Sequence, residues 1–292
     1  MTYLQIEEMP DLQRPTFVAA FRGWNDAGEA ATLAVRHLIE TWSARPFASI
    51  DPEELFDFTV ARPMIRVTEE GLRDLQWPSN RFFYHRSDEG RGDVVLMVGA
   101  EPHLKWRAFT DAVIDLFRQV DASRLVTMGS LVTATLHSRP PPLTGFATEE
   151  SLRATLEGMT VSRARYEGPT GIVGTLHDAF RRADLPAASL WVGLPAYLGG
   201  APNPQGSLAL LQALDRLLGI DLDLAELAAM SQAFTEQVEA ALEGNDEMKA
   251  YIADLEAKMD AGIAEAGVPD LPPSGEIIGD LEDFLRRQRS DN

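Results

Sequence analysis

The residues best suited to chemistry lie in the stretch FRGWNDAG at positions 21–28, where an apolar run ends and a helical pattern begins. In open α/β sheets, ligands bind at the carboxyl ends of strands, where the free N–H groups of a helix start favour negative charge. The stretch therefore predicts a ligand-binding loop, whose residues are Gly23, Trp24, Asn25, Asp26 and Gly28. The alternative is structural, with Asn25 or Asp26 capping the helix and Gly28 allowing close packing.

Two further candidates follow other predicted strands. Glu101 comes after the apolar run at 94–98, and Tyr197 comes after the run at 189–194. Because the carboxyl ends of parallel strands meet at one edge of a sheet, we expect both side chains to join Trp24 around a pocket for a small, partly aromatic ligand. Tight turns also need Gly and Pro for structural reasons, so a purely structural role for these loops stays open.

His137 and Arg139 form a third candidate, one residue apart in the segment HSRPPP. In an extended chain, residues with this spacing project to the same side. The pair is suited to anion binding or acid–base chemistry, because histidine titrates near neutrality and arginine stays charged. The alternative is a loop in which backbone carbonyls hold both side chains.

The sequence predicts no metal site and no cofactor. Its five histidines are scattered, with no pair at helical or zinc-motif spacing, and it contains no cysteine. It also lacks the G-x-S-x-G elbow that marks a serine nucleophile. Whether the protein is an enzyme therefore stays open.

Alternating strands and helices over residues 1–218 predict that a three-layer α/β/α sandwich positions the candidates. The expected strands are apolar runs, typical of strands covered on both faces, at 16–21, 94–98, 124–128 and 189–194. Helical spacing follows at 31–39, 106–117, 171–180 and from Asn203 or Ser207 onward. The segment 65–84 predicts an inserted hairpin or edge pair, and the acidic stretch at 51–54 predicts a helix start.

Residues 219–292 predict a separate, acidic helical extension. Two apolar stripes, at 227–242 and 248–259, indicate an antiparallel pair of helices, followed by a linker at 267–275 and a short helix at 277–287. The extension carries 18 acidic and five basic residues. Short amphipathic helices need a partner surface, so we expect a lid or dimerisation arm that packs on the sandwich.

The charge of the whole chain restricts its partners. There are 26 basic and 45 acidic residues, a formal net charge of −19, which argues against binding to nucleic acid or to anionic membranes. An anionic ligand would need a local pocket. The absence of cysteine, of a basic and apolar leader and of any run long enough to span a membrane predicts a cytoplasmic protein.

An ordered series of motifs resembles the actinobacterial-type bacterial branch of the PAC2 (proteasome assembly chaperone 2) family. The motifs run from about residue 17 to 255 and include FRGWNDAGEAATLAVRHL, GAEPHLKW, HSRP, EGPTGIVGTLHDAF and SLWVGLPAY. The resemblance implies a sandwich similar to purine nucleoside phosphorylases, a C-terminal helical extension and a homo-oligomer, for which a trimer is one form.

The chain departs from the family pattern at three places. The eukaryotic chaperone is associated with a C-terminal docking tail of a hydrophobic residue, Tyr and any residue, whereas this chain ends with 290–292, SDN. The family pattern implies a His where Ala196 stands and Asp-Pro where Thr135-Leu136 precede His137.

Two functions remain open. The first is a non-enzymatic assembly or scaffold protein related to proteasome assembly chaperones, which binds a protein partner through the surfaces of Leu227, Phe234 and Ile252. The second is an enzyme or sensor that binds a small anionic or nucleoside-like ligand at the predicted loop edge; fold likeness alone does not establish that chemistry.

Overall fold

The computed structural model describes residues 3–68, 70–87, 92–159 and 161–261. One nine-stranded sheet runs through it in the order β1-β3-β6-β7-β2-β8-β11-β9-β10. Its centre is parallel and consists of β7 (Val94–Ala100), β2 (Thr16–Arg22), β8 (Arg124–Thr133) and β11 (Ala187–Pro195). The outer strands are β1 (Leu4–Ile6), β3 (Arg45–Ile50), β6 (Asn80–His85), β9 (Leu143–Ala147) and β10 (Ser162–Arg163).

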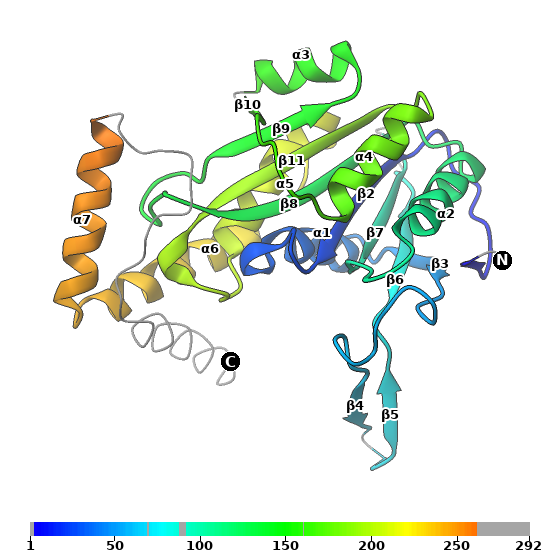
Figure 1. The fold of residues 1–292 in the computed structure, drawn as a ribbon, viewed down its shortest axis with the longest axis horizontal. Coiled ribbons are helices and arrows are strands. Elements are labelled where there is room, and N and C mark those ends of the chain that lie inside the picture. The colour runs from blue at the N-terminus through cyan, green and yellow to red at the C-terminus, as the bar shows by residue number, and fades with distance from the viewer. Residues whose placement is uncertain (1–2, 69, 88–91, 160, 262–292) are drawn as a thin grey trace.

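Helices cover both faces of this sheet (Figure 1). On β2, Val18 and Ala20 face α1 (Ala30–Thr41) and α5 (Pro204–Leu218). Phe17 and Phe21 face α2 (Trp106–Gln119) and α4 (Ile172–Arg182) on the other side. A further helix, α3 (Glu150–Gly158), packs against β9, β10 and β11. The predicted three-layer sandwich is confirmed, and its buried strands are the continuous apolar runs of the sequence.

The strand β8 extends five residues beyond its predicted end. Gly129 was expected to begin a loop, but it lies inside the strand and pairs with Trp191 of β11. A Cβ atom at Gly129 would lie only 2.6 Å from the Trp191 ring. The glycine is therefore needed because the indole lies across it, and it does not end the strand.

The helix predicted to start at 51–54 is absent. The amides of Leu55 and Phe56 donate to the Pro52 carbonyl, at 3.0 and 3.1 Å, and the Asp51 carboxylate accepts from the Glu53 amide. The chain makes only a turn there because Leu55 and Phe56 must reach the core, where they are buried.

The segment predicted as an insertion forms a small hairpin of its own. The strands β4 (Met64–Val67) and β5 (Arg73–Gln76) pair with each other and with no other strand in the described part of the chain. Figure 1 shows this hairpin projecting away from the sandwich. The aromatic run 82–84, expected in the same insertion, instead belongs to β6 of the main sheet.

Two helices, α6 (Ala225–Leu242) and α7 (Asp246–Asp260), form the described part of the C-terminal extension. Figure 1 shows α7 running across the direction of α6, so the two helices do not lie side by side as an antiparallel pair. Their apolar stripes meet Leu136, Tyr197 and Leu198 of the sandwich. The boundary between 218 and 219 stays a prediction, and the expected linker, last helix and tail at 267–292 lie outside the described residues.

Candidate functional site

The loop after β2 continues the sheet. The Ser130 amide donates to the Asn25 carbonyl at 2.9 Å, and the Glu101 amide donates to the Arg22 carbonyl at 2.8 Å. Gly23 has a φ of +128°, which an L side chain rarely adopts, and its carbonyl accepts from the Asp26 amide at 3.1 Å. The loop is thus held by both neighbouring strands.

Asn25 and Glu101 meet within this loop cluster. Asn25 is almost fully buried, and its Nδ2 donates to Glu101 Oε1 at 3.2 Å. The same oxygen accepts from the Ile172 amide, at 2.6 Å, in the first turn of α4. A Cβ at Gly171 would lie about 2.5 Å from both polar side chains. The carboxylate of Glu101 therefore occupies the anion position that the start of α4 offers.

The carboxylate of Asp26 accepts hydrogen bonds from the start of α1 in the same way. Its Oδ1 accepts from the amides of Ala31, at 2.8 Å, and Thr32, at 3.2 Å, and its Oδ2 accepts from Thr32 Oγ1 at 2.5 Å. Burial raises the pKa of Asp26, although these hydrogen bonds act in the opposite direction. The geometry favours the capping alternative, because this carboxylate faces the helix.

The other two residues of the predicted loop differ in environment. Gly28 has a φ of +55°, and a Cβ there would lie 3.0 Å from the Ala201 carbonyl, so close packing explains it. Trp24 is 62% exposed and lies at the surface.

His137 and Tyr197 form a second, buried cluster. The His137 amide donates to the Tyr197 hydroxyl at 2.8 Å, and His137 Nδ1 lies 2.7 Å from the same hydroxyl. The hydroxyl thus accepts from the amide and stays free to donate its own proton to Nδ1, an arrangement in which neutral His137 carries its proton on Nε2. Burial lowers the pKa of His137 and raises that of Tyr197, so both are neutral at pH 7.

Arg139 points to the helical extension. Its guanidinium contacts Glu256 at 3.1 Å and Asp260 at 2.8 Å, both on α7. Between the Asn25–Glu101 pair and the residues His137, Arg139 and Tyr197, no hydrogen bond or ion pair is present in the described part of the chain. The nine predicted residues therefore do not form one site. Asn25 and Glu101 meet in one cluster and His137 and Tyr197 in another. Among the residues that the structure describes, Trp24 and Arg139 are bonded to neither pair.

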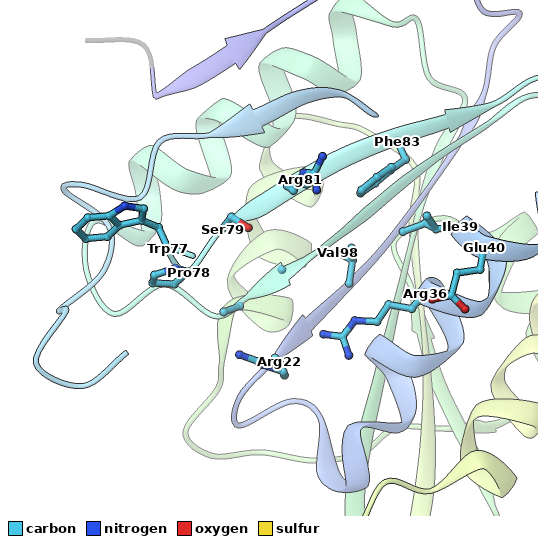
Figure 2. A pocket seen from close by; sticks show the side chains of 12 residues that line it. Arg22, Arg36, Ile39, Glu40, Trp77, Pro78, Ser79, Arg81, Phe83 and Val98 are labelled. Atoms are coloured by element: carbon cyan, nitrogen blue, oxygen red, sulfur yellow. The ribbon is translucent and has the colours of Figure 1, made fainter. Parts of the chain in front are cut away.

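A cavity of about 330 Å³ lies beside the first cluster, on the α1 side of the sheet (Figure 2). None of the nine predicted residues lines it. Its wall consists of Arg22, Arg36, Ile39, Glu40, Trp77, Pro78, Ser79, Arg81, Phe83, Val98, Gly99 and Ala100. The sequence analysis missed Arg22, Arg36 and Arg81, because they are far apart in the sequence. The alternation of side chains along β2 and β6 is the one signal that would have placed Arg22 and Arg81 on the same face of the sheet.

Two searches among the described residues give negative results. No group of three or more His, Asp or Glu side chains is arranged to hold a metal ion. No helix there is both long and apolar enough to cross a membrane.

Exposed apolar side chains gather on the projecting hairpin. Of the fifteen large hydrophobic residues that are exposed in the described part of the chain, seven lie between 60 and 77. They are Val60, Met64, Ile65, Val67, Leu72, Leu75 and Trp77. Ile65, Val67 and Leu75 lie on one face of the hairpin, because Ile65 pairs with Leu75 and Val67 follows two residues along β4. Exposed apolar residues grouped in this way mark interaction sites.

Comparison with known proteins identifies relatives over most of the chain. The PAC2 family model matches residues 20–242. A PAC2 family protein from Streptomyces avermitilis is 35% identical, with a TM-score of 0.74, over 82% of this chain and 99% of its own. The Mycobacterium tuberculosis proteasome-assembly chaperone homologue Rv2125 is 37% identical, with a TM-score of 0.73, over 81% and 99%.

More distant matches show the fold alone. The M. tuberculosis protein of unknown function Rv2714 is 24% identical, with a TM-score of 0.80, over 98% of this chain and 96% of its own. No curated protein matches this chain. The expected likeness to purine nucleoside phosphorylases is not tested by these matches and stays a prediction. Since the family model covers most of the sequence and two structures exceed 30% identity to it, the chain belongs to the PAC2 family.

Proposed function

We propose that this chain is an assembly or scaffold protein that binds a protein partner through the β4–β5 hairpin. The name of one relative, a proteasome-assembly chaperone homologue, supports a role in protein assembly. The comparisons give no support to the alternative of an enzyme. The observation that carries the proposal is the exposed apolar surface of the hairpin.

The hairpin has little reason to be apolar unless a partner covers it. All eight residues of its two strands are exposed, including Ile65 at 56% and Val67 at 70%. An isolated two-stranded hairpin is at best marginally stable in water, and its outer edges carry unpaired backbone groups. A bound protein would cover the apolar side chains and pair with those edges.

The surface predicted for a partner on the helical extension does not serve this purpose. Leu227 and Phe234 are buried against the chain's own residues, at 1% and 6% exposure. The prediction was wrong because these side chains attach the extension to the sandwich. We therefore place the partner surface on the β4–β5 hairpin, which lies between β3 and β6 in the sequence.

The proposal also covers the location of the protein, its oligomeric state and its division into two parts. We place the protein in the cytoplasm, as a homo-oligomer for which a trimer is one form, with residues 1–218 and 219–292 as its two parts. Light scattering on the purified chain should give a mass of two or more times 32.1 kDa, and a mass of 32.1 kDa would contradict the homo-oligomer.

Co-purification tests the partner surface. The tagged full chain is isolated from its own cells beside the variant Ile65→Thr/Val67→Thr, which removes apolar surface but keeps the β-branched side chains that suit a strand. We expect the wild type to retain a protein at a fixed stoichiometry and the variant to lose it. Because both positions are exposed, the variant should unfold at the same denaturant concentration as the wild type.

The control is Leu104→Thr, which removes a half-exposed leucine outside the hairpin. It should retain the partner. If the hairpin variant also retains it, or if the wild type brings down only copies of itself, the proposal fails.

A further inference from the structure

The cavity on the α1 side of the sheet arises from strand alternation. Val18 and Ala20 face α1, so Arg22, two residues further along β2, faces the same side. On β6, Phe83 belongs to the same core, which places Arg81 on that face as well. The sheet register sets Arg81 opposite Val98, which in turn lies opposite Ala20. Two strands thus bring two arginines to one face.

The helix α1 supplies the third arginine. Figure 2 shows Arg36 extending from α1 into the hollow that Arg22 also borders, with Arg81 further along the sheet. The three guanidiniums come from segments that begin at residues 16, 30 and 80. They line one cavity because α1 packs on the face of the sheet that carries Arg22 and Arg81.

Little negative charge compensates these arginines. Neither Arg22 nor Arg81 has an ion pair with a described acidic residue, and Arg36 has a single long contact of 3.6 Å to Glu29. Glu40 is the one acidic residue of the wall, so the wall carries two net positive charges in a chain of net charge −19. Arg81 is further held over the Phe83 ring, 5.1 Å from its centre.

The cavity also lies where open α/β sheets bind ligands. After β2 the chain enters α1 on one face, and after β7 it enters α2 on the other. The neighbouring ends of these strands therefore form a topological switch point. Arg22 ends β2 and Ala100 ends β7, and the two are partners in the sheet and line the cavity together.

We propose that this cavity binds a small ligand that carries a carboxylate or phosphate group. Arginine forks bind the oxygens of such groups in pairs of parallel hydrogen bonds. The rest of the wall is mixed. Ile39, Phe83 and Val98, together with Trp77, offer apolar surface to a hydrophobic or aromatic body, while Glu40 and Ser79 are polar. The volume of about 330 Å³ is at the small end of the range for ligand pockets. Trp77 belongs both to this wall and to the exposed apolar residues at 60–77, whereas the strands β4 and β5 contribute no residue to the cavity.

Calorimetric titration of the full chain tests the site with benzoate and phenyl phosphate, and with benzamide as the uncharged match of benzoate. We expect one anion to bind per chain, with an affinity that falls as salt is added. Benzamide should bind at least about tenfold more weakly, because it has no negative charge and only one acceptor oxygen for the guanidiniums.

Variants assign the binding to the cavity. Arg36→Gln and Arg81→Gln should each weaken anion binding about tenfold, and Arg36→Lys should lie between Arg36→Gln and the wild type, since it keeps the charge but loses the fork. The control Arg118→Gln removes the same charge from α2, on the other face of the sheet, and should leave the affinity unchanged. All three positions are exposed or half-buried, so circular dichroism should show an unaltered fold.

Three results would overturn the proposal. These are no saturable binding of either anion up to about 10 mM, equal binding of benzoate and benzamide, or full binding by an Arg22→Gln/Arg36→Gln double variant. The hairpin variant Ile65→Thr/Val67→Thr should bind the anions normally. A loss of binding in that variant would also contradict a small-ligand site that is separate from β4 and β5.

Discussion

Asp26 is a candidate ligand-binding residue whose observed contacts are those of a helix cap. Its carboxylate accepts three hydrogen bonds from Ala31 and Thr32, and burial raises its pKa. Asp26→Ala would leave these buried donors without an acceptor, so we expect a loss of about 2 kcal/mol in the free energy of unfolding. Asp26→Asn keeps one acceptor oxygen and removes a buried charge, so it should cost less than about 1 kcal/mol.

Urea unfolding of the two Asp26 variants separates capping from ligand binding. A capping role requires that Asn be tolerated better than Ala. Equal losses for both variants, or no loss for either, would contradict the capping assignment.

His177 gives the protein a pH dependence that can be measured. It lies on the buried face of α4 with Nε2 2.8 Å from Thr127 Oγ1, and burial lowers its pKa from 6.5 to about 4. Between these two values the unfolded chain binds a proton that the folded chain does not, so stability falls as the pH falls from 6.5 towards 4. The loss reaches about 3 kcal/mol at the lower end.

Unfolding of His177→Gln across this pH range isolates the histidine. The variant cannot take up that proton, so its stability should depend less on pH between 6.5 and 4 than that of the wild type. His37→Gln removes a histidine from the partly exposed side of α1 and serves as the control. The assignment is wrong if both variants keep the pH dependence of the wild type.

At the residue scale, the sequence identified the polar side chains of the loops but not their roles. The residues Asn25, Asp26 and Glu101 do lie near each other or near helix starts, as expected from strand ends. Their hydrogen bonds are made within the protein, however. The spacing of residues in the sequence does not show which donor groups a carboxylate will contact in the fold. The arginines of the cavity were missed because their proximity depends on the register between β2, β7 and β6.

At the scale of elements, the helical extension depends on apolar packing. Phe234 of α6 is buried with Tyr197 and Leu198, whereas Arg139 is one third exposed and its partners on α7 are largely exposed. Phe234→Ala should therefore lower the free energy of unfolding by about 3 kcal/mol. Arg139→Gln should produce little change, because exposed ion pairs contribute little. A larger loss for Arg139→Gln than for Phe234→Ala in denaturant titrations would contradict this account.

The elements found from the sequence are those with the strongest periodicity. Each central strand is a buried apolar run, and α2 and α4 repeat apolar residues on one face. The edge strands were missed because their signals are weak: β3 contains Pro46 and a register shift, and β9 contains Gly145. The hairpin was found, but its pairing was not, because Pro78 and Ser79, which separate β5 from β6, were not used as a break between the two strands.

At the scale of the whole molecule, two surfaces stand out against the acidic remainder. One is the arginine-lined cavity, and the other is the apolar β4–β5 hairpin. Both are formed by residues from β2 to β7. The acidic extension instead follows α5 and packs against Leu136, Tyr197 and Leu198. A protein of net charge −19 stays soluble through charge repulsion, so an apolar surface on it is expected to be kept for a specific contact.

Photo-crosslinking in living cells tests the hairpin contact most directly. Val67→p-benzoylphenylalanine places a reactive group on the hairpin, and the same substitution at Leu104 provides the control, since both side chains are at least half-exposed. We expect position 67 to crosslink in high yield to one other protein and position 104 to give no such product. Equal yields at the two positions, or crosslinks from position 67 to further copies of this chain alone, would contradict the proposed function.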